Sequence, residues 1–183
     1  MNTFPLFNGR PTEPRTARED AAYDFLEKLG IPFRRVDHAP AMTMEDCVAI
    51  DGALGVSMCK NLFLCNRQKT DFYLLLMPGD KPFRTKELSN QLETARLSFG
   101  SAEDMEHLLG VSPGAVTVMG LINDRENRVR LLIDKDLLDD AEIGCHPLVN
   151  TSSVAFSMQA LLQSFLPATH HTPTAVTLLG KDV

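Results

Sequence analysis

The chain has 183 residues, enough for one domain, and 44% of them are hydrophobic while 23% are charged. No apolar run approaches the roughly 20 residues of a membrane span, and the formal net charge of −6 disfavours DNA or other non-specific nucleic-acid partners. The N-terminus lacks the pattern of a secretory signal, and the four cysteines include no CxxC pair. We therefore expect a cytoplasmic protein with reduced thiols and no membrane partner.

The first third of the chain predicts two helices and a strand after an irregular arm. Residues 1–15 are rich in proline, arginine and glycine, which is typical of an arm without regular structure. Two helix starts follow, each a threonine with an acidic residue three positions later. The predicted elements are a helix from Thr16 to Gly30, a strand over 31–37 and a helix from Thr43 to near Gly52.

The rest of the chain alternates hairpins with short helices. Apolar runs predict strands that pair across polar turns, and serine or threonine residues precede the helical segments. The run at 72–77 is apolar on both faces, as expected of a covered central strand. Strands are predicted at 59–66, 72–77, 96–99, 115–122, 128–133 and within 143–156, with helices at 85–92, 101–110 and 158–166 and an edge strand at 175–179.

Hairpins interspersed with helices, without a regular βαβ alternation, predict an α+β fold. We expect a single compact domain in which a mixed, largely antiparallel sheet is flanked by helices.

Lys60 lies at the start of a predicted strand whose neighbours are mostly apolar. Because side chains alternate along a strand, Lys60 shares one face with Leu62 and Leu64, and Asn61 and Phe63 share the other. A lysine on an apolar face either extends to the rim or meets an anionic partner. Both readings remain open from the residues alone.

The segment from Gly110 to Gly114 matches the G-x-S-x-G pattern of a serine-hydrolase elbow. An elbow uses the backbone N–H of the residue after the serine, and here that residue is Pro113, which has none. We therefore reject Ser112 as a nucleophile. The alternatives are a plain connection and a rigid turn that presents the N–H groups of Gly114 and Ala115 to a ligand.

His146 stands in a loop framed by Gly144, Pro147 and Asn150, where a polar side chain can contact a ligand. Cys145 precedes it, but adjacent residues on an extended segment point to opposite faces and chelate poorly. We therefore predict no metal site. No phosphate-binding glycine motif is present either, so we predict no cofactor.

Three motifs, in this order and at these separations, resemble the YbaK/prolyl-tRNA-synthetase-associated family, and within it the free-standing prolyl-tRNA editing proteins. They are Lys60 to Leu64, Gly110 to Gly114 and Gly144 to Thr151. The resemblance covers roughly residues 16–166. It leaves residues 1–15 as an arm and residues 167–183 as a tail with an edge strand.

The resemblance implies a metal-independent enzyme that hydrolyses the ester joining a wrong amino acid to tRNA. The family's essential lysine falls on Lys60, its small-residue loop on Ser112, Pro113 and Gly114, and its pocket histidine on His146. We add Gly144 and Asn150, which frame His146, and Leu62 as pocket lining. Lys60 would then hold the phosphate or ribose of the substrate, and the predicted pocket is lined by Leu62, Leu64 and residues after Gly114.

The expected partners are the acceptor end of mischarged tRNA(Pro) and prolyl-tRNA synthetase. Basic candidates for tRNA contact are Arg34, Arg35, Lys81, Arg84, Lys86 and Arg96. The leading prediction is an alanyl-tRNA(Pro) deacylase. The alternatives are a related deacylase for cysteine or serine and a non-catalytic module that binds an aminoacyl end or an amino acid.

Overall fold

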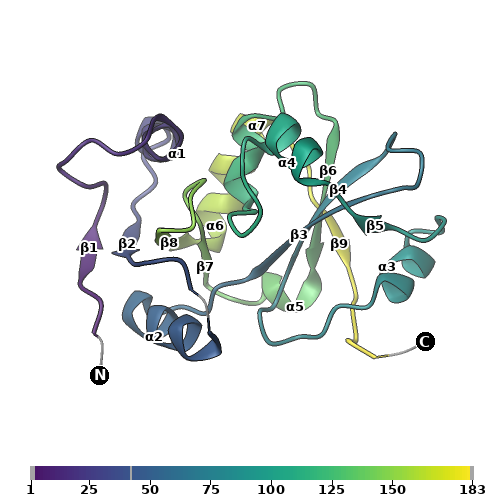
Figure 1. The fold of residues 1–183 in the computed structure, drawn as a ribbon, viewed down its shortest axis with the longest axis horizontal. Coiled ribbons are helices and arrows are strands. Elements are labelled where there is room, and N and C mark those ends of the chain that lie inside the picture. The colour runs from purple at the N-terminus through teal and green to yellow at the C-terminus, as the bar shows by residue number, and fades with distance from the viewer. Residues whose placement is uncertain (1–2, 42, 182–183) are drawn as a thin grey trace.

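The computed structural model describes residues 3–41 and 43–181 and arranges their strands in two sheets (Figure 1). The four-stranded sheet is antiparallel and follows the order β1-β2-β8-β7. Its strands are β1 (Leu6–Asn8), β2 (Arg34–Asp37), β7 (Glu142–Cys145) and β8 (Ser152–Ser157).

The five-stranded sheet is mixed, with the order β5-β3-β4-β6-β9. Strands β3, β4 and β5 pair antiparallel, whereas β6 pairs parallel with both β4 and β9. Its strands are β3 (Lys60–Cys65), β4 (Phe72–Met77), β5 (Ser98–Phe99), β6 (Val129–Asp134) and β9 (Thr174–Val176). The α+β class, with mixed pairing and flanking helices, is therefore confirmed, although the strands divide between two sheets.

The sheets meet at a parallel bridge between Met58 and Gly144, just before β3 and within β7. The main apolar core lies between the sheets and contains residues of both, such as Phe63 and Ile133 from one and Val154 and Phe156 from the other. Because all these side chains are buried in one cluster, the two sheets form one domain.

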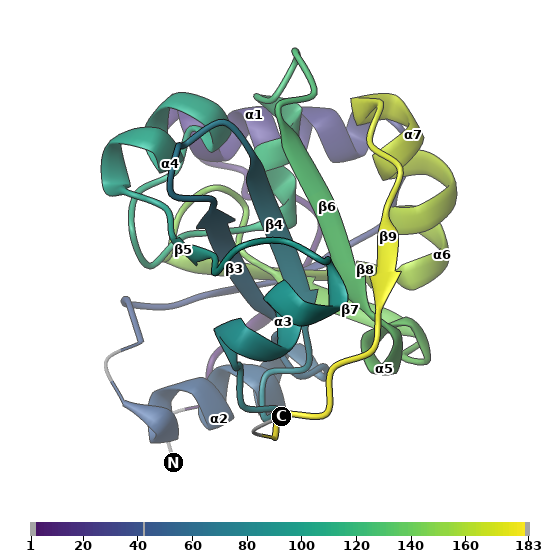
Figure 2. The same cartoon turned by 90° about the vertical axis from the view of Figure 1, so that its right-hand side faces the viewer.

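Helices cover the outer faces and close the gap between the sheets. Figure 2 shows α3 lying across the face of the five-stranded sheet, where Leu88 of α3 packs with Leu64 and Leu75 in a second apolar cluster. Under α2 a small third cluster joins Leu54 to Val36 and Ala155. The helical elements are α1 (Ala17–Lys28), α2 (Met44–Leu54), α3 (Thr85–Gln91), α4 (Ala102–Leu109), the 3₁₀ turn η1 (Val118–Ile122), α5 (Lys135–Leu138), α6 (Met158–Ala160), the π turn η2 (Leu161–Phe165) and α7 (Leu166–Thr169).

The capping patterns in the sequence predicted several helix starts correctly. Thr43 and Asp46 form a reciprocal capping box at α2, with N–H to side-chain oxygen distances of 3.0 and 3.1 Å. Thr16 accepts the N–H of Glu19 at 3.2 Å, but the Glu19 carboxylate turns inward and accepts from Tyr23 at 2.6 Å. At α3, Thr85 is the first helical residue and Arg84 occupies the N-cap position.

Four expected elements differ from the structure. The arm over residues 1–15 contains β1, which pairs with β2. The strand expected at 115–122 is wrong: Thr117 caps the 3₁₀ turn η1, so no hairpin forms with β6. The helix expected to stop at Pro167 continues to Thr169, because the π turn η2 precedes the proline. The edge strand expected at 175–179 is β9, which covers Thr174–Val176. Among the described residues no helix is both long and apolar enough to cross a membrane.

Candidate functional site

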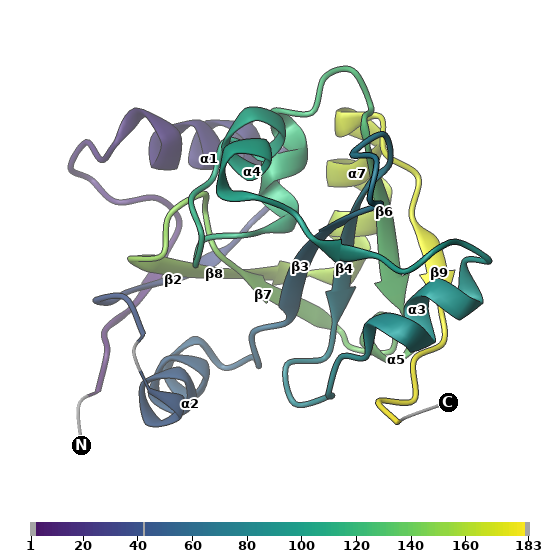
Figure 3. The ribbon, with the colours of Figure 1, turned by 45° about the vertical axis from the view of Figure 1, so that its right-hand side comes forward.

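The three motifs meet at the junction of the two sheets, near the bridge between Met58 and Gly144. Figure 3 shows the start of β3 beside β7, with the β7–β8 connection above it. The loop before η1 joins these two parts. Asn61 accepts the N–H of Val118 at 2.8 Å, and the Thr117 hydroxyl donates to the His146 carbonyl at 2.7 Å.

Lys60 points to the opposite face of β3 from Asn61. Its neighbours on that face, Leu62 and Leu64, belong to the cluster under α3, as the alternation of the strand predicts. The Lys60 ammonium donates to the carbonyl of Lys81, in the loop between β4 and α3. Lys60 is partly buried, and no carboxylate among the described residues forms an ion pair with it. Within residues 3–41 and 43–181, no carboxylate therefore compensates its positive charge.

The loop of Ser112, Pro113 and Gly114 is an exposed turn. Ala115 donates its N–H to the Ser112 carbonyl at 3.0 Å, and Gly114 has φ +88°, a combination that with proline at the second position defines a type II turn. Of the two N–H groups expected to be free for a ligand, that of Ala115 is therefore already used within the turn. The Gly114 N–H has no partner among the residues that the structure describes.

His146 is held in one orientation. Its Nδ1 lies 2.9 Å from the Ser152 carbonyl, which can only accept, so Nδ1 carries the proton and Nε2 keeps its lone pair in the neutral ring. Burial lowers the pKa of His146, and the nearby His38 charge lowers it further, although the Ser152 bond opposes both. The neutral ring therefore prevails at neutral pH, and Nε2 can accept a proton or a hydrogen bond.

The residues expected around His146 have different positions. The amide of Asn150 lies over the turn, 3.5 Å from where a Cβ on Gly114 would stand. Gly144 is buried, and a Cβ there would come within 3.0 Å of the Met58 sulfur and 3.1 Å of Val56. Gly144 thus lets the two sheets approach each other, while its predicted contact with a ligand stays a prediction.

The residues predicted to line the pocket belong to two apolar clusters. Leu62 and Leu64 pack under α3, whereas Ala115 and Val118 lie in the main core on the other side of the sheet. A pocket lined by both groups stays a prediction. Leu62 lies on the α3 face of β3 together with Lys60, which begins the strand two residues after the bridge between Met58 and Gly144.

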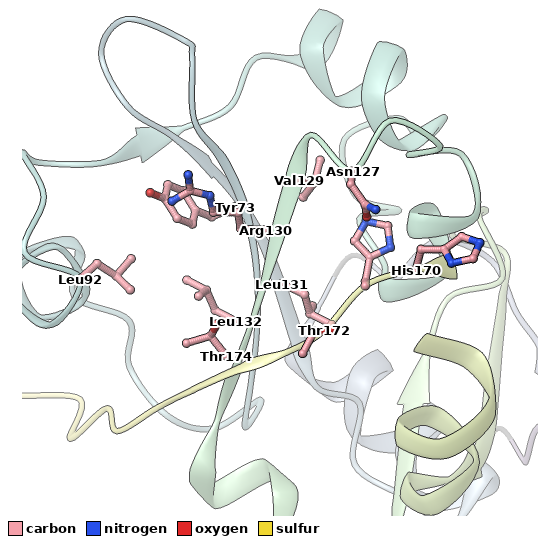
Figure 4. A pocket seen from close by; sticks show the side chains of 11 residues that line it. Tyr73, Leu92, Asn127, Val129, Arg130, Leu131, Leu132, His170, Thr172 and Thr174 are labelled. Carbon is pink, nitrogen blue, oxygen red and sulfur yellow. The ribbon is translucent and has the colours of Figure 1, made fainter. Parts of the chain in front are cut away.

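Two cavities lie elsewhere and include none of the predicted site residues. One, of about 300 Å³, follows β6 and β9 and is shown in Figure 4, with Tyr73, Arg130 and His170 among its lining. The other, of about 670 Å³, lies between α1 and the four-stranded sheet, near Phe33 and Glu142. Within residues 3–41 and 43–181, no three histidine, cysteine or acidic side chains are grouped as a metal site.

The model of the aminoacyl-tRNA editing domain family matches residues 38–163, which is more than half of the chain. The chain belongs to this family. The match runs from His38 after β2 to η2, so it contains Lys60, the turn and His146. It leaves β1, α1 and β9 outside.

Named relatives of this editing domain agree with the match. The prolyl-tRNA editing protein ProX of Acetoanaerobium sticklandii is 29% identical over 153 residues, which cover 84% of this chain and 93% of the relative. The prolyl-tRNA synthetase associated domain-containing protein 1 of Danio rerio is 30% identical over 156 residues, 84% of either chain. A crystal structure described as a candidate trans-editing enzyme for prolyl tRNA synthetase shares the fold, with a TM-score of 0.66, 16% identity, and coverage of 90% of this chain and 99% of that one.

Sequence reasoning did not predict three contacts that connect residues of the candidate site. Asn61 and Thr117 join β3, η1 and the His146 loop, and Lys81 receives the Lys60 ammonium. Asn61 carried a usable signal, because a polar side chain on the core-facing side of a strand needs a partner. Nothing in the sequence pointed to Lys81, since the Lys60 ammonium binds its backbone carbonyl and not its side chain.

The basic residues expected to contact tRNA divide into two groups. Arg34 pairs with Glu142 at 2.6 Å, Arg35 is buried beside Asp37, and Lys81 is bound by two carboxylates. These three are engaged within the protein. The other three are exposed, at the N-cap of α3, within α3 and shortly after it: Arg84, Lys86 and Arg96.

Proposed function

We propose that this editing domain is a free-standing aminoacyl-tRNA deacylase that hydrolyses the ester of mischarged tRNA(Pro), with alanyl-tRNA(Pro) as its substrate. Family membership and the relatives named for prolyl-tRNA editing support the reaction class. The observation that carries the residue-level proposal is Lys60, a partly buried cation whose described partner is a carbonyl and not a carboxylate. Such a charge is suited to a ligand that brings its own negative charge.

The terminal nucleotide of a charged tRNA supplies that charge. Lys60 has three ammonium donors, of which the Lys81 carbonyl takes one, so the others can hold the terminal phosphate or ribose. The Gly114 N–H, exposed and unpartnered among the described residues, would polarise the ester carbonyl. Water would then attack the carbonyl carbon, either directly or after a substrate hydroxyl has taken over the acyl group. The acyl–oxygen bond to the ribose would break, the ribose oxygen would take up a proton, and the free amino acid would leave, in a reaction that depends on positioning.

His146 would hold the substrate through Nε2, since its other ring nitrogen is already bound to Ser152. Asn150, over the turn, would contact the same end of the substrate. Ser112 is exposed and carries a hydroxyl, but Pro113 has no N–H to form the oxyanion hole of a nucleophile elbow. Ser112 would therefore not act as a nucleophile.

The selectivity for alanine follows from size. A synthetase pocket built for proline cannot strongly reject a smaller amino acid, because each missing methylene is worth only about 1–3 kcal/mol. A second site too small for proline reverses this preference, since overfilling a close-packed pocket is penalised. Prolyl-tRNA synthetase is the partner whose errors the protein would correct.

A panel of mischarged tRNAs tests the proposal. We expect release of alanine from alanyl-tRNA(Pro), with prolyl-tRNA(Pro) left intact. Faster clearance of cysteinyl- or seryl-tRNA would instead indicate the related deacylase, and binding without release of any amino acid would indicate a non-catalytic module. Equal hydrolysis of alanyl- and prolyl-tRNA(Pro) would refute editing.

Site substitutions test the assigned residues. Lys60→Ala should reduce single-turnover deacylation at least 100-fold while the fold is kept, because it removes a charge that no described carboxylate balances. Ser112→Ala should cost little, whereas Gly114→Val should cost much more, since φ +88° disfavours a side chain and a bulky one would block the N–H. Near-normal turnover by Lys60→Ala would show that the site is misplaced.

A further inference from the structure

Lys81 joins three separate parts of the chain through its side chain. Its Nζ lies 2.6 Å from Asp134 Oδ2 at the end of β6, 2.6 Å from Asp136 Oδ2 in α5, and 2.8 Å from the carbonyl of Leu178. Three acceptors match the three ammonium donors of a lysine, so the side chain is held in one position. Although burial lowers the pKa of Lys81, the hydrogen bonds to Asp134 and Asp136 raise it above its ordinary value, so the cation persists.

The main chain of the same residue holds Lys60. The Lys60 ammonium donates to the Lys81 carbonyl, and the loop that carries Lys81 packs against the segment before β3. A Cβ on Gly79 would lie 2.5 Å from the Met58 carbonyl, which shows how closely this loop approaches. The side chain of Lys81 therefore fixes the loop, and the loop fixes the Lys60 ammonium.

The C-terminal strap, residues 174–181, completes this arrangement. Figure 2 shows it leaving β9 and passing below α3 toward the loop after β4. The Glu87 carboxylate of α3, which is 7% exposed, accepts the N–H groups of Leu179 and Gly180. A Cβ on Gly180, at φ +69°, would come within 3.2 Å of the Lys81 side chain. The strap thus lies directly on Lys81, although it is outside the 38–163 family match.

We propose that Lys81, held by Asp134 and the C-terminal strap, is a positioning residue that orients the Lys60 ammonium toward the substrate. This inference rests on the proposed role of Lys60. A free lysine side chain samples many rotamers, and an ammonium bound at one donor presents the other two in a restricted direction. The strap therefore serves the reaction through Lys81 and Lys60, without touching the substrate itself.

A double-mutant cycle in the full chain tests the pathway from Lys81 to Lys60. Lys81→Met keeps the apolar stem and removes the three bonds, and we expect single-turnover deacylation of alanyl-tRNA(Pro) to fall about tenfold. The Lys60→Ala protein should retain a slow deacylation that can be measured with enzyme in excess over tRNA. In that protein, Lys81→Met should change the rate less than twofold. An equal loss in both backgrounds would show that Lys81 supports only the fold, and no loss in either would also overturn the proposal.

Two further variants separate positioning from folding. Lys69→Met is the matched control, because it removes an exposed lysine that also pairs with a carboxylate, that of Asp104, and it should leave the rate unchanged. Glu87→Ala removes the carboxylate that binds the strap but keeps Asp134 and Asp136, the two carboxylates that bind Lys81. It should lower the deacylation rate about threefold. If Glu87→Ala is fully active at wild-type thermal stability, the strap has no part in positioning.

Acetylation of lysines by acetic anhydride, mapped by mass spectrometry, reads out Lys60 without any enzymatic reaction. Lys81→Met should increase the acetylation rate of Lys60 at least threefold, and Lys69→Met should not. If the increase occurs but the wild-type protein releases no amino acid from any tRNA, the proposed function fails while the positioning contact stands. If the Lys60 acetylation rate is unchanged by Lys81→Met, the positioning proposal is wrong.

Discussion

Asn61→Leu perturbs the hydrogen bond that joins β3 to the start of η1. The Asn61 side-chain oxygen accepts the N–H of Val118 at 2.8 Å, and its amide donates to the Cys59 carbonyl at 3.2 Å. Val118 is fully buried, so water does not replace the lost acceptor. Leucine keeps the branched shape of asparagine but is larger, so the substitution removes the polar contacts without leaving a cavity.

The expected loss of stability follows from the unsatisfied N–H. Leaving one buried donor without a partner costs about 1–3 kcal/mol. For a domain of 150–250 residues each kcal/mol lowers Tm by about 2–4 °C, so a loss of about 2 kcal/mol predicts a fall of about 4–8 °C. Deacylation by the folded variant should fall too, because η1 follows directly on the segment that bonds to the His146 carbonyl.

Urea and thermal unfolding measure the stability change, and single-turnover deacylation measures the functional one. Asn90→Leu is the matched control, since Asn90 is an exposed residue of α3, and its free energy of unfolding should stay within about 0.5 kcal/mol of wild type. If the free energy of unfolding of Asn61→Leu also stays within that margin, the reasoning is refuted, because the Val118 N–H would then have found another partner.

Two more outcomes follow from packing and charge. Gly120→Ala should lower the free energy of unfolding by about 1–3 kcal/mol, because the new Cβ would stand 2.9 Å from the Cβ of Leu109. Urea titrations measure this loss, and unchanged stability would mean that α4 can shift freely. For Asp37, burial raises the pKa, but hydrogen bonds from Arg35, Ser152 and Arg15 outweigh it and hold the pKa below its ordinary value. This carboxylate therefore stabilises the fold fully above its unfolded pKa, and the contribution is lost as pH falls through its folded pKa. Asp37→Asn should be less stable than wild type at pH 7, and the difference should shrink as pH falls below the unfolded pKa of an aspartate; a difference of unchanged size at low pH would contradict the assignment.

Local signals in the sequence predicted the elements that local interactions determine. The capping pairs at Thr43 and Ser101 depend on contacts within one turn, and α2 and α4 begin where these pairs predict. The β3–β4 hairpin follows from two apolar runs around a short polar turn. These interactions span few residues, so the sequence alone contains them.

Elements determined by distant contacts were not predictable in the same way. Residues 115–122 have a β-forming composition, yet Thr117 bonds to the His146 carbonyl and Gly120 packs on Leu109, and both contacts bend the segment into η1. The same reasoning applies to the site. Alternation along β3 correctly placed Lys60 on an apolar face with Leu62, but the acceptor that holds it is a backbone carbonyl, which has no signature in the sequence.

The site depends on how the two sheets are held together, because its parts belong to different sheets. Lys60 begins a strand of the five-stranded sheet, and His146 directly follows β7 of the four-stranded one. The bridge between Met58 and Gly144 lies two residues before each of them, so any change in its spacing moves the lysine relative to the histidine. A side chain at Gly144 would force this change, because its Cβ would press on Met58 at 3.0 Å. The glycine and the histidine of the third motif therefore have separate roles, since Gly144 sets how closely the sheets approach and His146 is the residue that we propose to hold the substrate.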